Sequence, residues 1–412
     1  GYGKVGGLVG SNFGSISKSY ATGAVSGNGY GKVGGLVGSN FGSISNSYAT
    51  GAVSGNSKVG GLVGSNYGSI SNSYATGAVS GNSKVGGLVG SNFGSISNSF
   101  WDADTTGMND GVGFDYGSTS NLNPIDASNR LLSITYQSAG WTFGSSPNSG
   151  TWFMIDGETR PFLQSEYSTT ITNAHQLQLM SMDLGAHYTL SNNIDMTNEF
   201  NNVSGMWATD RGTSFGSGFV PVGNYGNNFT GSLDGLGHTI SGLYINRPVT
   251  WGVGLFGYGA GTVSNIGLLN VSINGSGGVG ALVGSNSGSI SHSYSTGTVQ
   301  GIDNDEGGLV GYNNGGISNS YSSASVNGSY HVGGLVGHNS GVITGTYATG
   351  DVTSVLGSSD GIGGLVGYNY GSISNSYATG AVSGYGYGNV GGLVGDNGGS
   401  ITSSYATGNV SV

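Results

Sequence analysis

A unit of 26 to 30 residues recurs along the chain, and this repeat constrains the fold more than any other feature. Periods of roughly 20 to 50 residues are typical of solenoids and other repeat arrays. Each regular unit contains GGLVG or a close variant, and an Asn, a Gly, an Ile and an aromatic residue follow its Leu by four, six, eight and twelve residues. Length varies between the aromatic residue and the next Leu, which indicates a rigid frame with one tolerant loop per unit.

Three columns of equivalent residues define this frame. The Leu column contains Leu8, Leu36, Leu62, Leu88, Leu282, Leu309, Leu335, Leu365 and Leu393, and Leu255 belongs to an irregular unit. The Asn column contains Asn12, Asn40, Asn66, Asn92, Asn286, Asn313, Asn339, Asn369 and Asn397. The aromatic column contains Tyr20, Tyr48, Tyr74, Tyr294, Tyr321, Tyr347, Tyr377 and Tyr405. Stacked units would turn each column into a ladder, in which Asn amides hydrogen-bond from one unit to the next and occupy left-handed turns.

The units predict an all-β fold, a right-handed parallel β-solenoid (β-helix) with about three short strands per coil of 26 to 30 residues. Their β-branched segments (VGGLV, SIS, SYAT and AVS) are separated by Gly, and none is long or periodic enough for a helix. Parallel strands about 4.8 Å apart would join successive coils. Propeller blades are longer, at about 40 to 45 residues, and leucine-rich repeats space their Leu differently.

Two positions conflict with simple strand alternation. Leu8 and Val9 are adjacent, so one of the two columns would face outward as an apolar stripe, unless the preceding Gly pair forms a bulge or corner that turns both inward. Lys18 and its equivalents would face the core in an unbroken strand, so we expect a bend near Ser17.

We expect two solenoid segments joined through capping elements, because a single coil buries too little apolar surface to be stable alone. Residues 1–100 would be the last coils of a first solenoid, and residues 101–166 an irregular, aromatic-rich cap or junction. Residues 167–250 would start a second solenoid, with a short capping helix near 173–183 that Asn173 caps, and residues 251–412 would be its regular coils.

Charge is distributed unevenly along the chain. The net charge is -10, yet residues 1–100 contain five Lys and no acidic residue. Four of these Lys form one column, four residues before each Leu: Lys4, Lys32, Lys58 and Lys84. Such a basic ladder would be either a contact for an anionic glycan or a solvated edge that discourages aggregation, and the second is favoured. Lys and Arg are too sparse to predict nucleic-acid binding.

Composition excludes several other classes of protein. The chain has no Cys, which excludes disulfides and thiolate metal sites. It has no run of about 20 apolar residues, so we expect no transmembrane segment. Because it opens with Gly1 inside a repeat, we expect a piece of a longer protein whose export signal lies outside this sequence.

Catalysis and metal binding are weaker expectations. The enzymes built on β-helices need carboxylates that converge in a groove, whereas the first hundred residues carry no acid and the six His are scattered. We therefore predict no catalytic residues and no metal site. Asp102 with Asp104, or Asp303 with Asp305, could hold Ca²⁺, but both pairs lack a full calcium-binding loop, and turn formation is favoured.

The sequence GGLVGSNFGSISNSYATGAVSG resembles the GLUG repeat of large bacterial surface proteins, which occurs in haemagglutinin-like adhesins and in non-catalytic regions of immunoglobulin-A metallopeptidases. About ten units match this pattern. Residues 99–164 resemble the end of such a domain, and residues 171–247 resemble its beginning. The active site of the metallopeptidases is not implied, because HExxH is absent from the chain.

We therefore predict a non-catalytic, extracellular structural or adhesive rod of a bacterial surface protein, which presents loops or distal domains to a host or environmental glycan or protein. The alternative is a self-assembling fibre or sheath subunit, joined laterally through the apolar stripe or end to end through the solenoid. A polysaccharide-degrading β-helix enzyme ranks third. The fibre predicts filaments from purified protein alone, whereas the adhesin predicts soluble monomeric rods.

Overall fold

The computed structural model describes residues 3–213, 215–354, 361–385 and 388–412. Nearly all regular structure is short parallel strands that pair in register with the strand one repeat away, which confirms the β-solenoid. The chain divides into two compact units. Unit 1 comprises residues 1–167 and 199–215, and unit 2 comprises residues 168–198 and 216–412. Residues 199–215 therefore belong to unit 1, although the sequence analysis places them in the second segment.

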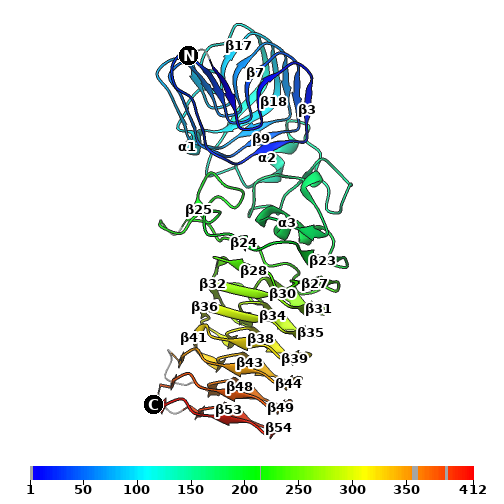
Figure 1. Cartoon of the computed structure of the whole chain (residues 1–412), viewed down its shortest axis with the longest axis vertical. Coiled ribbons are helices and arrows are strands. Elements are labelled where there is room, and N and C mark those ends of the chain that lie inside the picture. The colour runs from blue at the N-terminus through cyan, green and yellow to red at the C-terminus, as the bar shows by residue number, and fades with distance from the viewer. Residues whose placement is uncertain (1–2, 214, 355–360, 386–387) are drawn as a thin grey trace. The chain divides into compact units, whose positions relative to one another are not determined.

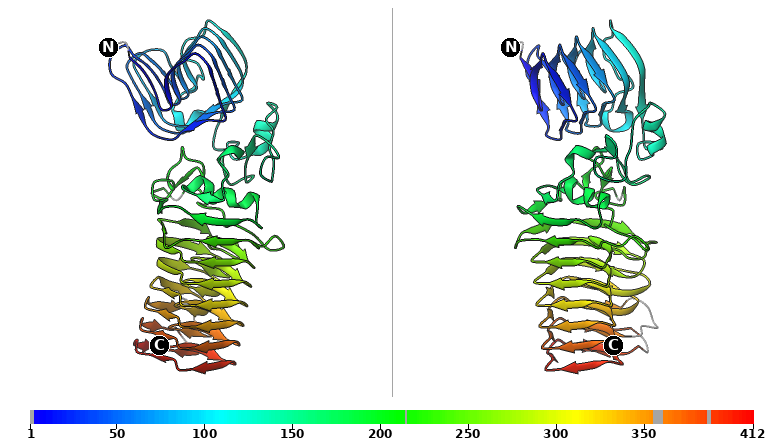
Figure 2. Two further views of the ribbon diagram at one scale, coloured as in Figure 1. Left: turned by 45° about the vertical axis from the view of Figure 1, so that its right-hand side comes forward. Right: turned by 90° about the vertical axis from the view of Figure 1, so that its right-hand side faces the viewer.

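Each regular coil of unit 1 contains five short strands, where about three were expected, because Gly and left-handed residues break the strands. The right-hand view of Figure 2 shows these strands side by side. The first columns are β1 (Lys4–Gly6), β6 (Lys32–Gly34), β11 (Lys58–Gly60) and β16 (Val85–Gly86), and then β2 (Val9–Asn12), β7 (Val37–Asn40), β12 (Val63–Asn66) and β17 (Val89–Asn92). The remaining strands are β3 (Ser15–Ser17), β8 (Ser43–Ser45), β13 (Ser69–Ser71), β4 (Tyr20–Ala21), β9 (Tyr48–Ala49), β14 (Tyr74–Ala75), β5 (Val25–Ser26), β10 (Val53–Ser54), β15 (Val79–Ser80) and the longer β18 (Ser95–Asp102).

The adjacent Leu and Val columns both face the core, so neither forms an outward stripe. Leu36 and Val37 are fully buried in one hydrophobic cluster with their equivalents in the neighbouring coils. The chain bends at the preceding Gly pair, where a Cβ on Gly35 would overlap the carbonyl oxygen of Gly61 in the next coil. The Gly pair therefore forms a corner between two strands, and this corner turns both columns inward.

The expected bend after Ser17 is present, and it is also where the left-handed residues lie. Lys18, Asn46 and Asn72 have φ of 49°, 47° and 46°. Asn and Lys with positive φ are uncommon outside such turns. The Asn column itself does not have positive φ, so the expectation that this column forms the left-handed turns is wrong.

Irregular segments of unit 1 cover both the end and the side of its solenoid: β19 (Ser118–Ile125) pairs in parallel with β18 at the end of the stack, and Trp141 and Trp152 pack against the side. Their other elements are α1 (Ala103–Thr106), α2 (Ser133–Gln137), β20 (Trp152–Phe153), β21 (Phe162–Leu163), η1 (Gln164–Glu166), β25 (Asn201–Asn202) and β26 (Thr209–Asp210). Trp141 and Trp152 stack on each other and contact Tyr74. The Tyr48 hydroxyl donates to Glu166 at 2.8 Å, and the Tyr74 hydroxyl donates to the Pro161 carbonyl at 2.8 Å. The aromatic residues of this segment thus pack against the side of the coils.

Unit 2 starts with β22 (Thr170–Ile171), α3 (Ala174–Leu179), η2 (Met180–Met182), β23 (His187–Leu190) and β24 (Ile194–Asp195). The Asn173 side chain caps α3 by accepting from the Gln176 amide at 3.0 Å. Leu177 and Leu179 are fully buried. These elements pair with the first coil through β23 and β27 (Ser232–Asp234).

The coils of unit 2 follow one another in chain order, as Figure 1 shows from β28 to β53. One sheet continues from β27 through β31 (Thr262–Ser264), β35 (Ser289–Ser291), β39 (Gly316–Ser318), β44 (Val342–Thr344), β49 (Ser372–Ser374) and β54 (Ser400–Thr402). A second sheet contains β30 (Phe256–Gly259), β34 (Val283–Asn286), β38 (Val310–Asn313), β43 (Val336–Asn339), β48 (Val366–Asn369) and β53 (Val394–Asn397). A third sheet contains β33 (Val279–Gly280), β37 (Asn304–Gly307), β42 (Tyr330–Gly333), β47 (Ile362–Gly363) and β52 (Val390–Gly391).

The remaining sheet of unit 2 includes β24 and closes each coil. Its other strands are β28 (Thr239–Ser241), β29 (Tyr244–Arg247), β32 (Gly267–Gly275), β36 (Tyr294–Gln300), β40 (Tyr321–Ser322), β41 (Ser325–Gly328), β45 (Tyr347–Ala348), β46 (Val352–Ser354), β50 (Tyr377–Ala378), β51 (Val382–Ser383), β55 (Tyr405–Ala406) and β56 (Val410–Ser411).

Candidate functional site

The structure places the Asn and Tyr columns as ladders inside each unit. Within each unit, every Asn amide except the last donates to the next Asn, for example Asn12 Nδ2 to Asn40 Oδ1 at 2.8 Å and Asn286 Nδ2 to Asn313 Oδ1 at 2.8 Å. Ring centroids in the Tyr column lie 4.6 to 5.3 Å apart. The Asn amides are buried in most coils and satisfied by one another, so this column holds the coils in register.

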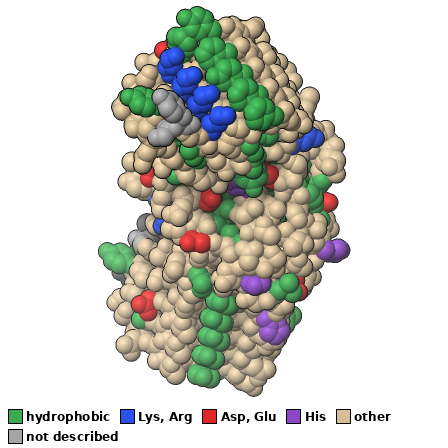
Figure 3. All heavy atoms as spheres, turned by 45° about the horizontal axis from the view of Figure 1, so that its top comes forward, with side chains coloured by type: hydrophobic (Ala, Val, Ile, Leu, Met, Phe, Trp, Pro, Cys, Tyr) green, Lys and Arg blue, Asp and Glu red, His purple; other side chains and the backbone are tan. Residues whose placement is uncertain are grey.

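The four Lys of unit 1 lie beside a second column that the sequence analysis did not single out. Phe13, Phe41, Tyr67 and Phe93 stack at 4.8, 4.8 and 5.1 Å between centroids, with interplanar angles of 4° to 7°. We call these four rings, with Lys4, Lys32, Lys58 and Lys84, the lysine–aromatic stripe. Figure 3 shows it as a blue row beside a green row on the surface. Each ring follows its Leu by five residues, and this constant spacing was the signal that could have revealed the column.

Three Lys of the stripe reach the stripe ring of the next coil, and Lys84 Nζ lies 3.8 Å from the centroid of Phe114, beyond the last ring of the stripe. Nζ lies 5.4 Å from the Phe41 centroid for Lys4, 4.9 Å from Tyr67 for Lys32 and 5.4 Å from Phe93 for Lys58. Lys32 also donates to the Tyr67 hydroxyl at 3.3 Å. These are cation–π distances, so the rings hold the ammonium groups in a row without neutralising them.

A shallow groove follows the aromatic side of the stripe. Its floor is made by the Gly-Ser pair that follows each ring, from Gly14 and Ser15 to Gly94 and Ser95. The inner rings remain 38% to 39% exposed, although they are large and apolar. The groove therefore offers apolar edges, serine hydroxyls and a parallel row of positive charges, all repeating with the coil.

The first pair of carboxylates considered for Ca²⁺ instead binds arginine. Asp102 is fully buried, and its Oδ2 lies 2.6 Å from Arg160 Nη2 and 3.3 Å from Arg130 Nη1. Asp104 pairs with Arg130 as well. Two guanidinium groups neutralise the two carboxylates, which favours a buried ion-pair network over a cation site.

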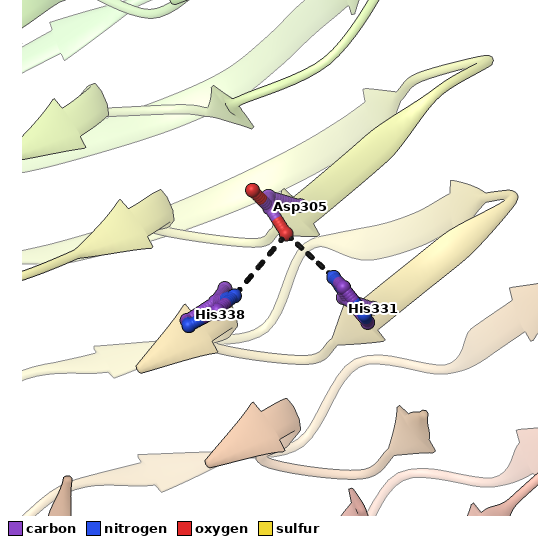
Figure 4. A group of neighbouring side chains, drawn as sticks. All are labelled: Asp305, His331 and His338. Atoms are coloured by element: carbon purple, nitrogen blue, oxygen red, sulfur yellow. Dashed lines mark hydrogen bonds and ion pairs between the residues drawn. The ribbon is translucent and has the colours of Figure 1, made fainter. Parts of the chain in front are cut away.

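The second pair separates in the structure. Asp303 accepts from Trp251 Nε1 at 3.3 Å, whereas Asp305 turns toward two histidines from the next coil. Asp305 Oδ1 lies 2.8 Å from His331 Nδ1 and 3.7 Å from His338 Nδ1. Figure 4 shows the three side chains converging from neighbouring strands. We call Asp305, His331 and His338 the Asp–His–His cluster; the spacing of these His along the sequence does not predict that they meet.

The cluster is shielded and electrostatically coupled. Asp305 has 8% of its side chain exposed, His331 25% and His338 16%. Burial raises the pKa of Asp305, but hydrogen bonds and charge interactions with His331 and His338 outweigh it and lower the pKa. Asp305 is therefore a carboxylate at neutral pH, and its one oxygen faces a ring nitrogen from each histidine.

None of the helices in the part of the chain that the structure describes is both long and apolar enough to cross a bilayer.

Comparison with known proteins agrees with the repeat pattern. The GLUG motif matches residues 1–26, 29–54, 55–80, 328–353 and 358–383. Halomucin of Haloquadratum walsbyi is 46% identical over 91 residues, which is 21% of this chain and only 1% of the length of halomucin. A solved structure from Bacteroides ovatus, provisionally named an immunoglobulin A1 protease, aligns over 59% of this chain and 83% of its own, with 20% identity and a TM-score of 0.35. The chain is thus a β-solenoid in which five of the repeat units match the GLUG motif.

Proposed function

We propose that this chain is a non-catalytic, extracellular rod of a surface or secreted protein and that the lysine–aromatic stripe binds an acidic polysaccharide laid along the coils. The GLUG repeats and the match to halomucin support the location. The choice of ligand rests on the row of four Lys beside the column of four stacked, exposed rings, three of which lie under a Lys of the stripe.

The geometry fits a linear polyanion better than a single small anion. Lys4, Lys32 and Lys58 are direct partners in paired strands, so their backbones repeat about every 4.8 Å. The rings stack face to face, which leaves their edges for the ligand. Aromatic edges carry partial positive charge, so they add to the field of the ammonium groups. Sugar hydroxyls would meet the serines of the groove floor.

The same features argue against self-assembly through this face. A second copy that placed its own stripe here would bring four Lys against four Lys, which is unfavourable without an anion between them. The Leu and Val columns are buried in the inner coils, so they do not form the outward apolar stripe through which fibre subunits could join laterally. We therefore expect monomeric rods from purified protein, and filaments seen by electron microscopy would favour the fibre instead.

The test is binding of polygalacturonate, with neutral dextran as the uncharged comparison, measured by calorimetry at two salt concentrations. Replacing Lys4, Lys32, Lys58 and Lys84 together with Gln should weaken binding about 30-fold, because four contacts of about 0.5 kcal/mol each total about 2 kcal/mol. Binding of the unmodified protein should also weaken as salt increases.

Lys18→Asn is the matched control. Lys18 is exposed but lies outside the stripe, and Asn46 and Asn72 occupy the same column in the next coils. This variant should bind like the parent. The proposal is wrong if the fourfold variant keeps the parental affinity, or if dextran binds as well as polygalacturonate.

A further inference from the structure

We infer that the Asp–His–His cluster is a binding site for a divalent transition-metal ion, of which Zn²⁺ is the best candidate, bridging two adjacent coils of unit 2. This inference goes beyond the proposed function and does not depend on it, because the stripe lies in unit 1.

The three candidate ligand atoms already lie close enough together to coordinate one metal ion. One oxygen and two ring nitrogens all lie within 4.8 Å, with Asp305 Oδ1 at 2.8 Å from His331 Nδ1 and 3.7 Å from His338 Nδ1. Ligands about 2.0 to 2.1 Å from Zn²⁺ stand roughly 3 Å apart. A metal placed among the three atoms thus needs only small side-chain movements.

The backbone at two of the three residues gives an independent reason to assign them a ligand. Asp305 and His331 have φ of 71° and 52°, and both occupy the column four residues before the Leu. In the coils on either side, this column contains Gly278 and Gly361, also with positive φ. Asp305 and His331 thus keep side chains at a position where both flanking coils have Gly, and these two side chains meet each other.

His338 comes from a different column and is held in place by its neighbours. Its Nε2 lies 3.1 Å from Ser340 Oγ, which leaves Nδ1 directed at Asp305. The Tyr312 and Tyr368 rings, which occupy the same column in the adjacent coils, lie 4.7 and 5.2 Å from its ring centroid. A polar partner on the second nitrogen is the usual support of a metal-bound histidine.

The donor set selects the class of ion. Two imidazoles and one carboxylate suit Zn²⁺, Cu²⁺, Ni²⁺ and Fe²⁺, whereas Ca²⁺ and Mg²⁺ prefer oxygen ligands alone. One carboxylate and two neutral imidazoles leave an overall charge of +1 once a divalent ion is bound. The partial burial of all three side chains further favours binding over exchange with water.

The repeat itself supplies variants that should fold, because each one installs the residue found in a neighbouring coil. These are Asp305→Gly as in Gly278, His331→Gly as in Gly361, and His338→Tyr as in Tyr312. His292→Asn is the control: it removes a histidine outside the cluster, and Asn319 and Asn375 occupy the same column with the same left-handed backbone.

The experiment uses the full chain, stripped with EDTA and titrated with Zn²⁺ by calorimetry and with Co²⁺ by visible absorption. We expect one ion per chain, a Co²⁺ spectrum of low coordination number, and slower hydrogen exchange in β37 and β42 when Zn²⁺ is present. Each cluster variant should weaken binding at least about 100-fold, since loss of a supporting partner alone costs about 10- to 100-fold. The control should bind like the parent.

Two results would overturn the inference. Either the parent binds no Zn²⁺ at micromolar concentration, or the cluster variants bind it as tightly as His292→Asn does. Because polysaccharide binding is measured with the stripe variants in unit 1, failure of the metal site and failure of the proposed function are separate outcomes.

Discussion

Replacing Asp102 with Asn is expected to destabilise unit 1 by about 3 to 5 kcal/mol, because removing one member of a buried ion-pair network leaves the other charges without compensation. Asp102 is fully buried against Arg130 and Arg160, whose side chains are 3% and 0% exposed. Asn keeps the size of the side chain but removes the charge that the two guanidinium groups share.

The consequence should extend to residues 199–215, because Arg160 ties them to the coils. Its Nε donates to the Gly205 carbonyl at 3.0 Å and its Nη2 to the Val203 carbonyl at 3.1 Å. Urea unfolding monitored by tryptophan fluorescence reports on this unit, since four of the five Trp belong to it. Hydrogen exchange should accelerate in residues 199–213 before it does in the inner coils.

Asp104→Asn is the control for this prediction. Asp104 also pairs with Arg130, but 51% of its side chain is exposed, so its loss should cost less than about 1 kcal/mol. Equal urea midpoints for Asp102→Asn and the parent would contradict the ion-pair assignment. A rise in the parent's midpoint on addition of Ca²⁺ would instead support the cation site considered for these two carboxylates.

Replacing Glu306 with Val is expected to stabilise unit 2 by about 2 kcal/mol at neutral pH, because it removes a buried carboxyl with an incomplete set of hydrogen bonds. Glu306 is fully buried, and among the described residues its Oε1 has no hydrogen-bond partner. Its Oε2 accepts a long hydrogen bond from the Ser329 amide at 3.4 Å. The residues paired with it in the two adjacent coils are Val279 and Val332, so Val fits the position.

The effect should depend on pH in a defined direction. Burial, with the nearby charges of Asp305 and Asp303, raises the pKa of Glu306 well above its ordinary value of 4.5. The folded state therefore keeps the proton of Glu306 at pH values where the unfolded state has released it. The free energy of unfolding is thus not reduced by Glu306 below about pH 4.5. Above that pH it decreases, by at most about 1.4 kcal/mol per pH unit, until the pKa of Glu306 in the folded state is reached.

Urea unfolding of the parent and Glu306→Val between pH 4 and 8, in EDTA, tests this prediction through the difference between their stabilities. That difference should widen as the pH rises, while the contributions of Asp303, Asp305, His331 and His338 are present in both proteins. Glu306→Gln is the control, because it abolishes ionisation without adding apolar contacts and should remove the pH dependence with a smaller gain in stability. Parallel pH profiles for the parent and both variants would rule out a raised pKa at Glu306.

Contacts within a single column could be predicted from the period alone, because stacking places each residue over its equivalents. The Asn ladder from Asn12 to Asn40 and the Lys ladder from Lys4 to Lys32 follow directly from this rule. Contacts between columns could not be predicted, because they depend on where each coil bends. The proximity of Lys4 to Phe41 and of Asp305 to His338 arises from such bends.

The sequence by itself determined the coil, its period and its ladders, because a repeat that cannot bury its apolar residues alone must stack on copies of itself. Only the tertiary structure decided that Leu36 and Val37 both face inward, that Asp102 binds two arginines, and that Asp305 meets His331 and His338. The physical reason is that Gly and left-handed residues set the direction of the chain at each corner of the coil, and these directions decide which columns face one another.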